Sequence, residues 1–488
     1  MSHLLIALLF PPLLAAQTTI PKAWDEDALR SMTLPLAGLK APVKYAPADW
    51  YYRIPERTIY RSYPVYVPPK EPERYMNFVA AQAPETVAFD ASKLSNEADW
   101  ALAGESVFSS AGAAGFLTPD DMHNPDVWKK FHFKADAEGA LPGWRYFVRK
   151  KGLVEVGPTL CGTCHEGIVE EVTVPGAPGM PALGTLDAFS LRRQLNAARD
   201  REAAGRAEAG RLFALFSVPW QTPDPAERVA GLSPAQVLAV YDAQPPGVVT
   251  PAGTSLFFPP RIADLIGVKD RKYLGATGVY RHHDIGDLMR YAALEAGMEI
   301  YTQYGDFRPA GELPDPSKVT RLSDAQLYAL AVYMYRLKAP TNPNRMEKSA
   351  KRGQMIFERE GCAACHPAPL YTNGKLAPAE GFHPPAASED VMAAGAGTDP
   401  RLAMVTRRGT GYYRVPSLRG VWYRESLEHD GSLATLEDLF DPMRMRDGYV
   451  PTGFKGIGVE GRLVKGHAFA LNLSFEDRRA LMVFLRTL

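Results

Sequence analysis

The chain has 488 residues, of which 46% are hydrophobic and 23% charged, and this length exceeds what one hydrophobic core normally supports. The composition is that of a folded globular protein and excludes a largely disordered chain. Lysine plus arginine and aspartate plus glutamate both number 55, so the overall charge favours neither a nucleic-acid partner nor an anionic membrane surface.

The N-terminal segment, residues 1–16, has the pattern of an export signal. An apolar run, Leu4 to Phe10, is followed by two prolines and by the small residues Ala15 and Ala16. The run is too short to cross a bilayer and has the length of a signal peptide. We therefore expect cleavage after Ala16, a periplasmic location and no membrane span.

Residues 17–100 are rich in proline and aromatic side chains. Between Trp24 and Tyr75 they show neither a sustained helical pattern nor an alternating one. This favours an N-terminal extended strap that packs on the outside of the domains. A binding groove for a partner is the alternative, and we assign the segment no chemistry.

Helical patterns begin near Trp100 and recur to the C-terminus. The segment Leu322–Leu337 opens with a capping pair, Ser323 and Gln326, carries apolar residues on one face and ends before Pro340. The sequence therefore predicts a helix here that packs against a core.

The chain also contains internal repeats. The segment Leu473–Leu488 repeats the helical pattern 151 residues later, with Ser474 and Asp477 as its capping pair. A second pair of segments, which begin at Ile262 and Val415, aligns without gaps at a spacing of 153 residues. Two repeats at nearly the same spacing indicate a duplication.

Two Cys-x-x-Cys-His segments carry the chemistry. Each places two thiols one helical turn apart with a histidine directly after the second, the arrangement for two thioether bonds and one axial iron ligand. Zinc would need further ligands at suitable spacing, and a redox dithiol needs no histidine at this position. The predicted ligands of two covalent haem c groups are Cys161, Cys164 and His165 in the first segment and Cys362, Cys365 and His366 in the second.

The predicted fold is mainly α, with two cytochrome c-type haem domains related by duplication and joined by long loops. The first domain covers residues 101–340 and the second residues 345–488. A stretch rich in proline and asparagine, Ala339–Arg345, marks the boundary between them.

The second domain resembles a known family. The run Tyr412–Met443 is similar to the C-terminal domain of the bacterial di-haem cytochrome c peroxidase superfamily, which includes the methylamine-dehydrogenase maturation enzyme and the rubber oxygenases. Flanking segments such as Lys465–Phe469 are closest to the rubber-oxygenase-like branch. The matching residues are Val415, Pro416, Leu418, Arg419, His429, Asp430, Gly431, Ser432, Ala434, Thr435, Leu436, Glu437 and Asp438.

The resemblance is specific over about residues 345–488 and weaker over 255–340. It implies a di-haem oxidoreductase that uses peroxide or dioxygen and exchanges electrons with a small soluble electron-transfer protein. It also allows a calcium ion between the domains, for which the sequence shows no motif.

The resemblance offers two distal ligands for the haem held by His366. A methionine fourteen residues beyond His429 would be Met443, as in the peroxidases, and a histidine near the C-terminus would be His467, as in the rubber-oxygenase-like branch. We favour His467, because the flanking sequence follows that branch. We interpret His429 as structural.

The haem held by His165 lacks the distal histidine of the peroxidases. The matching position is Pro181, and no histidine lies between His165 and His282. This predicts an open or weakly held sixth iron position. His282 and His283 begin a helical pattern and are interpreted as structural, and Met180 is the other candidate ligand.

We expect an electron relay at the second haem and peroxide or dioxygen chemistry at the first, without a catalytic residue that the sequence can assign. Glu166, Glu170 and Glu171 follow the first motif, and a run of carboxylates is typical of a solvated surface. Two alternatives stay open: a non-enzymatic di-haem electron carrier, and a dioxygenase that cleaves a polyisoprene.

Overall fold

The computed structural model describes residues 19–112, 115, 117–385 and 388–488. The expected signal peptide lies outside these ranges. Within them, no helix is both long enough and apolar enough to cross a membrane.

The first half of the chain, residues 97–338, is built around two crossing helices. Helix α4, Glu97–Phe108, packs across α13, Asp324–Tyr335. The capping pair predicted for the second of these is confirmed, since the Ser323 hydroxyl accepts from the Gln326 amide and the Gln326 side chain accepts from the Ser323 amide.

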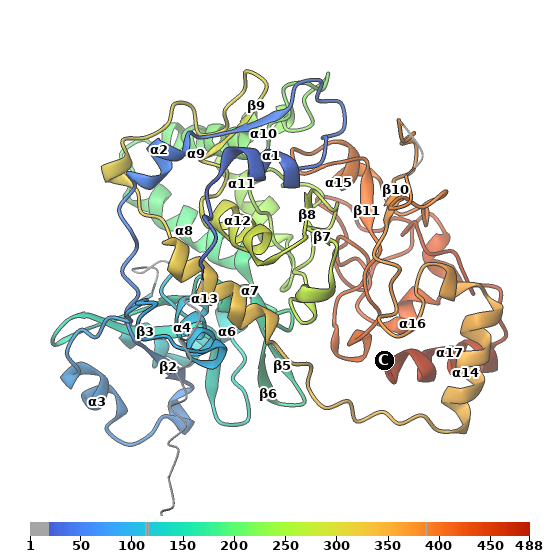
Figure 1. Ribbon diagram of the computed structural model, residues 1–488, viewed down its shortest axis with the longest axis horizontal. Coiled ribbons are helices and arrows are strands. Elements are labelled where there is room, and N and C mark those ends of the chain that lie inside the picture. The colour runs from blue at the N-terminus through green and yellow to red at the C-terminus, as the bar shows by residue number, and fades with distance from the viewer. Residues whose placement is uncertain (1–18, 113–114, 116, 386–387) are drawn as a thin grey trace, which may run out of the picture.

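The second half, residues 347–488, lies beside the first and is coloured orange to red in Figure 1. It too is built around two packed helices, α14, Lys348–Arg359, and α17, Phe475–Arg486. Ser474 caps the second helix by accepting from the Asp477 amide. The predicted C-terminal helix therefore forms as α17, but the other half of its predicted capping pair does not, because the Asp477 carboxylate pairs with Arg352 and Arg359 instead.

The two helix crossings share a close backbone approach. A Cβ added to Gly104 would overlap the carbonyl oxygen of Ala329, and a Cβ added to Gly353 would overlap that of Ala480. A pair of aromatic rings lies beside each crossing with centroids 5.3 Å apart: Phe108 and Tyr333 in the first half, Phe357 and Phe484 in the second.

The segments that align in the sequence also have matching local structure. In each, a glycine with a positive φ begins a short 3-10 helix, and a small antiparallel pairing follows. The matching pairs are Gly267 and Gly420 at the helix starts, Val268–Asp270 (η2) and Val421–Tyr423 (η5), and the bridges Leu274 to Tyr280 and Leu427 to Leu433.

The N-terminal segment is not uniformly extended, contrary to the prediction. It forms short elements because local caps start them; Asp25, for example, accepts from the Ala28 amide. Trp24 and Tyr51 stack with ring centroids 4.2 Å apart, in a core shared with α13. The elements are α1 (Glu26–Met32), β1 (Val43–Tyr45), α2 (Ala48–Tyr52), β2 (Ser62–Tyr66), η1 (Pro68–Lys70) and α3 (Tyr75–Ala81).

The first half also contains a three-stranded antiparallel sheet, two strands of which lie in the sequence between α4 and the first Cys-x-x-Cys-His segment. Strand β2 pairs with β3, Ala140–Lys150, which pairs with β4, Leu153–Pro158. The sequence analysis did not anticipate this sheet. Its inner side chains, among them Trp144 and Tyr146, form a separate core beneath α5 (Pro119–Met122) and α6 (Pro125–Lys130).

Three helices of the first half form another layer, coloured green in Figure 1. Their buried side chains, such as Leu191, Leu212 and Val240, make a core of their own. The helices are α8 (Leu183–Ala197), α9 (Arg201–Phe216) and α11 (Pro234–Asp242), with the short α10 (Glu227–Ala230) beside them.

The other elements are short, apart from α12 (Ile285–Ala296), which packs against α13. In the first half they are α7 (Gly162–His165), β5 (Glu166–Val169), β6 (Val172–Pro175), β7 (Tyr273–Leu274), β8 (Tyr280–Arg281), β9 (Thr302–Tyr304) and η3 (Pro316–Lys318). In the second half they are η4 (Cys362–Ala364), β10 (Leu376–Pro378), α15 (Arg401–Met404), β11 (Tyr412–Arg414), α16 (Leu436–Leu439) and η6 (Pro442–Met445).

Candidate functional site

Each Cys-x-x-Cys-His segment lies beside one of the helix crossings. The Cys161 amide donates to the Phe108 carbonyl at the end of α4, with N and O 3.2 Å apart. Cys362 begins the short helix that directly follows α14. The first segment therefore reaches the same kind of position as the second, although residues 109–160 intervene between it and its helix.

The four thiols are not set up for dithiol redox chemistry. Burial raises the pKa of Cys161 and of Cys164 to about 12, and that of Cys362 to about 11. Redox-active and zinc-binding cysteines have the opposite shift, because the thiolate is the reactive species. All four cysteines are partly buried and unpaired as disulfides.

Both motif histidines are held in the neutral form that can bind a metal. Burial lowers the pKa of His165 and of His366 to about 4. His366 Nδ1 lies 3.0 Å from the Tyr371 carbonyl oxygen, so this nitrogen carries the proton and Nε2 stays available. This is the arrangement expected of an axial ligand.

A backbone carbonyl also faces each imidazole from an equivalent place in the repeat. The Ala263 carbonyl opposes the burial effect on the pKa of His165, and the Pro416 carbonyl does the same for His366. These two carbonyls are 153 residues apart in the chain. His165 Nδ1 itself is buried and has no hydrogen-bond partner with good geometry among the described residues.

His467, the favoured distal ligand, has a carboxylate partner. Its Nδ1 lies 3.3 Å from Glu428 Oε1. Burial would raise the pKa of Glu428, but the His467 charge lowers it to about 2; burial would lower the pKa of His467, but Glu428 raises it. Burial is the main cause of the low pKa of His366, and the charge of His467 lowers it as well, so the two histidines lie close together.

Both members of this pair have left-handed backbone, with φ of 60° at Glu428 and 44° at His467. This conformation is unfavourable for residues other than glycine and is found most often where function requires it. Further contacts hold the pair in place: Thr398 Oγ1 donates to Glu428 Oε2 at 3.1 Å, and Arg444 donates to the His467 carbonyl at 2.8 Å.

Met443, the alternative ligand, lies in η6, and 46% of its surface is exposed. His429 packs against the ring of Tyr413 with centroids 4.9 Å apart, and its carbonyl accepts from the Arg261 amide. The His429 backbone therefore holds Arg261, while its Nδ1 is buried without a partner in the described part of the chain.

His282 and His283, interpreted from the sequence as structural, both have contacts within the first half. His282 uses both ring nitrogens, 2.8 Å from the Arg271 carbonyl oxygen and 2.7 Å from the Tyr335 hydroxyl. The side chain of His283 is 66% exposed and lies beside Asp287 on its own helix. The His282 imidazole could therefore not bind a second group without losing one of these contacts.

Met180 follows a loop that is tied to the first motif. The amides of Gly176 and Gly179 donate to the carbonyls of His165 and Cys164. Met180 Sδ packs against Gly247, where a Cβ would lie only 2.6 Å away. The loop thus contacts the attachment segment itself, whereas a sixth ligand must approach from the opposite face of a haem.

One expectation about the carboxylates was wrong. Glu166 is 5% exposed and is not part of a solvated surface. It accepts from the Gly143 amide at 2.7 Å and pairs with Arg145 at 3.2 Å, because the β3 strand passes over the first motif. Glu170 and Glu171 do lie at an exposed turn, as expected.

Sequence reasoning missed an arginine clamp that recurs in both halves. Arg271 and Arg424 are 153 residues apart. Each donates to two backbone carbonyls of a loop, and the same loop carries the carbonyl that faces the motif histidine of that half. The acceptors are Asp264 and Ile266 for Arg271, and Ser417 and Arg419 for Arg424. Both arginines stand at aligned positions, so the repeat itself contained the signal.

A second arginine pair crosses between the halves. Arg261 donates from its amide and Nε to the His429 and Glu428 carbonyls, at 2.9 and 2.8 Å. In the opposite direction, Arg414 of the second half donates from its amide at 3.0 Å and from its Nε at 3.4 Å to backbone carbonyls of the first half. Its acceptors are the carbonyls of Ala276 and Gly275, which are 153 residues before His429 and Glu428.

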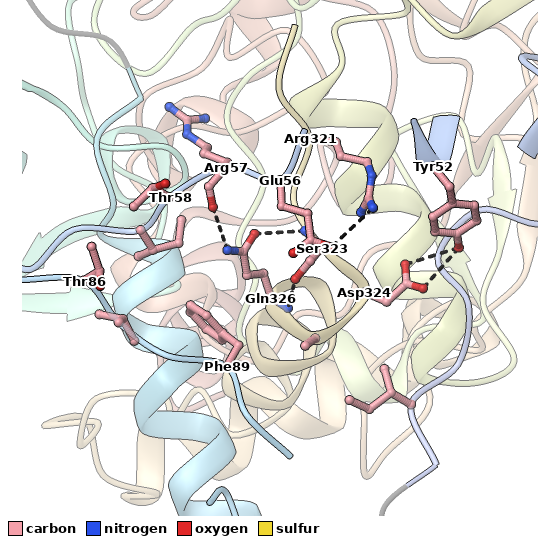
Figure 2. A pocket seen from close by; sticks show the side chains of 14 residues that line it. Tyr52, Glu56, Arg57, Thr58, Thr86, Phe89, Arg321, Ser323, Asp324 and Gln326 are labelled. Atoms are coloured by element: carbon pink, nitrogen blue, oxygen red, sulfur yellow. Dashed lines mark hydrogen bonds and ion pairs between the residues drawn. The ribbon is translucent and has the colours of Figure 1, made fainter. Parts of the chain in front are cut away.

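An open pocket of about 850 Å³ lies apart from these histidines, between the N-terminal segment and the start of α13 (Figure 2). Its charged groups are already engaged. Arg321 pairs with Glu56 at 3.3 Å, and Asp324 accepts from the Tyr52 hydroxyl at 3.1 Å. These contacts therefore hold the N-terminal segment against the start of α13.

No group of three or more His, Cys, Asp and Glu side chains in the described ranges could hold a metal ion. Neither a zinc centre at the cysteines nor the calcium site that the resemblance allows is marked by such a cluster. The donor sets do fit haem c, because each offers two adjacent thiols and a neutral histidine.

No protein-family model and no curated protein matches the chain. Among solved structures it is similar to a hydrazine synthase chain from Kuenenia stuttgartiensis, with 18% identity over 62% of this chain and 92% of that chain and a TM-score of 0.29. It is also similar to a MauG-like protein associated with microbial copper homeostasis, with 20% identity over 34% and 56% of the two chains and a TM-score of 0.21. These scores are too low to establish a shared fold, so the interpretation of the site depends on its own residues.

Proposed function

We propose that the chain is an exported di-haem c-type cytochrome made of two cytochrome c-type domains related by duplication. The observation that carries this proposal is the recurrence of one arrangement. Each half combines a Cys-x-x-Cys-His segment, a close helix crossing with an aromatic pair, and an arginine-clamped loop whose carbonyl faces the motif histidine.

The residues have defined roles in this proposal. Cys161 and Cys164 would hold one haem by thioether bonds and Cys362 and Cys365 the other, with His165 and His366 as proximal iron ligands. A bound haem c supplies an iron that takes up and returns one electron. The protein holds each imidazole in its neutral form, and His366 Nδ1 lies 3.0 Å from the Tyr371 carbonyl oxygen.

The two irons are proposed to differ. Glu428 orients His467 near His366, and a carboxylate on one ring nitrogen leaves the other free for a metal. At the first site, both ring nitrogens of His282 are engaged, and His283 is exposed beside Asp287. We therefore assign electron relay with a small soluble protein to the His366 site, and binding of an oxidant, peroxide or dioxygen, to the His165 site.

Haem attachment is tested by producing the chain with the machinery for c-type haem maturation. The mass of the denatured protein should exceed that of the polypeptide by two haems. Replacing Cys161 and Cys164 by alanine should remove one haem, and replacing Cys362 and Cys365 the other. His283→Ala is the matched control and should retain both. A wild-type protein without covalent haem would contradict the proposal.

The difference between the irons is tested by electron paramagnetic resonance of the ferric protein. We expect one low-spin signal unaffected by cyanide and one signal that cyanide changes. His165→Ala should abolish the second signal only. Two low-spin signals insensitive to cyanide would contradict oxidant binding and leave a di-haem electron carrier.

A further inference from the structure

The junction between the halves concentrates positive charge inside the protein. Arg261 and Arg271 come from the first half, and Arg414 and Arg424 from the second. Burial and the charges of the three other arginines together lower the pKa of Arg414 to about 9. Burial and Arg424 likewise lower the pKa of Arg261 to about 10. The four guanidinium groups are therefore close enough to repel one another.

The carboxylates near this cluster are too few to compensate it. Asp264 pairs with Arg424, with Nε and Oδ2 3.1 Å apart, and also attracts Arg261 and Arg271. Glu428 attracts Arg261 but is the partner of His467. Four guanidinium cations thus share two carboxylates. The four arginines are partly buried, and partly buried cations that share too few counter-charges are destabilising, so such a cluster favours an anionic ligand.

The same side chains keep unused donors. Arg414 uses Nε alone, and neither of its terminal nitrogens donates to any described residue. Arg261 uses Nε and Nη1, and its Nη2 is likewise without an acceptor in the described ranges. A guanidinium fork with free terminal nitrogens is suited to a planar carboxylate.

The position of the free donors connects them to both haem sites. Arg261 precedes by two residues the Ala263 carbonyl that faces His165, and Arg414 precedes by two residues the Pro416 carbonyl that faces His366. Each arginine also contacts the backbone of the other half. A carboxylate bound here would lie between the two attachment sites, and each haem carries two propionate carboxylates.

We propose that Arg261 and Arg414 bind haem propionate carboxylates at the junction, so that the guanidinium groups set the reduction potentials of the two haems. This inference rests on the proposed haem attachment. It adds an anion site, built from both halves, to which neither the motifs nor the resemblance led.

The test compares Arg414→Gln with the wild-type holoprotein. Loss of a cation beside the propionates favours the ferric haem, so the ferric-to-ferrous ratio at a fixed potential should rise about tenfold, which is 59 mV for one electron. Spectroelectrochemical titration measures the shift. Arg419→Gln is the matched control, since it removes the same charge from an exposed side chain five residues away and should change the ratio less than twofold.

Arg414→Lys is a second variant that keeps the charge and should shift the ratio less than threefold. Midpoints unchanged in Arg414→Gln, with both haems attached, would overturn the propionate site while haem attachment stands. Absence of covalent haem in the wild type would overturn both. Wild-type midpoints that move with added phosphate would show a free-anion site and also overturn the assignment.

Discussion

The close helix crossings make a sharp prediction about Gly353. A Cβ at this position would lie 2.6 Å from the Ala480 carbonyl carbon and 2.7 Å from the Phe484 Cβ, in addition to overlapping the carbonyl oxygen. Because the obstacle is helix backbone, α14 and α17 must move apart to accept a methyl group. Gly353→Ala should therefore destabilise the second half.

The magnitude follows from two opposing effects. Overpacking of a well-packed contact costs about 1–3 kcal/mol, and a backbone clash belongs at the upper end. Alanine in place of glycine inside a helix recovers about 1 kcal/mol. The net loss is about 2 kcal/mol, which corresponds to a melting temperature lower by about 4–8 °C for a unit of this size.

The assay is thermal unfolding followed by circular dichroism and by haem absorbance. Gly210→Ala in α9 is the matched control, because a Cβ there meets no atom within 4 Å, and it should raise the melting temperature slightly. Gly104→Ala should resemble Gly353→Ala. If Gly353→Ala and Gly104→Ala both behaved like Gly210→Ala, the argument from the crossings would be refuted.

Three further predictions concern single side chains. His467→Ala should turn the second haem from low-spin to high-spin in electron paramagnetic resonance, while Met443→Leu leaves it unchanged; the reverse result would make the methionine the ligand. Glu428→Gly removes the carboxylate 3.3 Å from His467 Nδ1 and should weaken the sixth ligand so that cyanide binds the second haem; an unaltered cyanide response would contradict this. Arg407→Ala should cost about 3–5 kcal/mol in a chemical denaturation assay, since it removes the fully buried partner 2.9 Å from Glu299 and leaves Glu299 with Arg408 alone at 3.5 Å; a loss below about 1 kcal/mol would refute it.

The sequence predicted the features that local pattern controls. The helix at residues 324–335 and its cap follow from apolar spacing and a Ser-x-x-Gln signal, and both are present. The aligned segments that begin at Ile262 and Val415 have the same turns, because glycines with positive φ stand at matching positions. The assignment of His282 as structural also followed from its place at a helix start.

Other features depend on contacts that no local pattern reveals. Gly104 could not be matched with Gly353, because residues 109–160 separate its helix from the first motif, whereas Gly353 stands only nine residues before Cys362. Glu166 was misjudged for a related reason. A strand remote in sequence covers it, so neighbouring carboxylates gave no warning of its burial.

The repeat also shows why the two halves need not do the same work. Arg414 binds the Gly275 carbonyl and Arg261 the Glu428 carbonyl, at equivalent left-handed turns with φ of 79° and 60°. Glycine adopts this conformation freely, whereas glutamate does so at a cost of roughly 1–2 kcal/mol. That cost is understandable only if the side chain is needed, and Glu428 uses it to hold His467. The first half keeps the glycine and has no such carboxylate. In the proposed function, this one difference at one turn separates a site whose distal histidine is oriented by a carboxylate from a site without such a carboxylate, while the backbone contacts that join the halves stay the same.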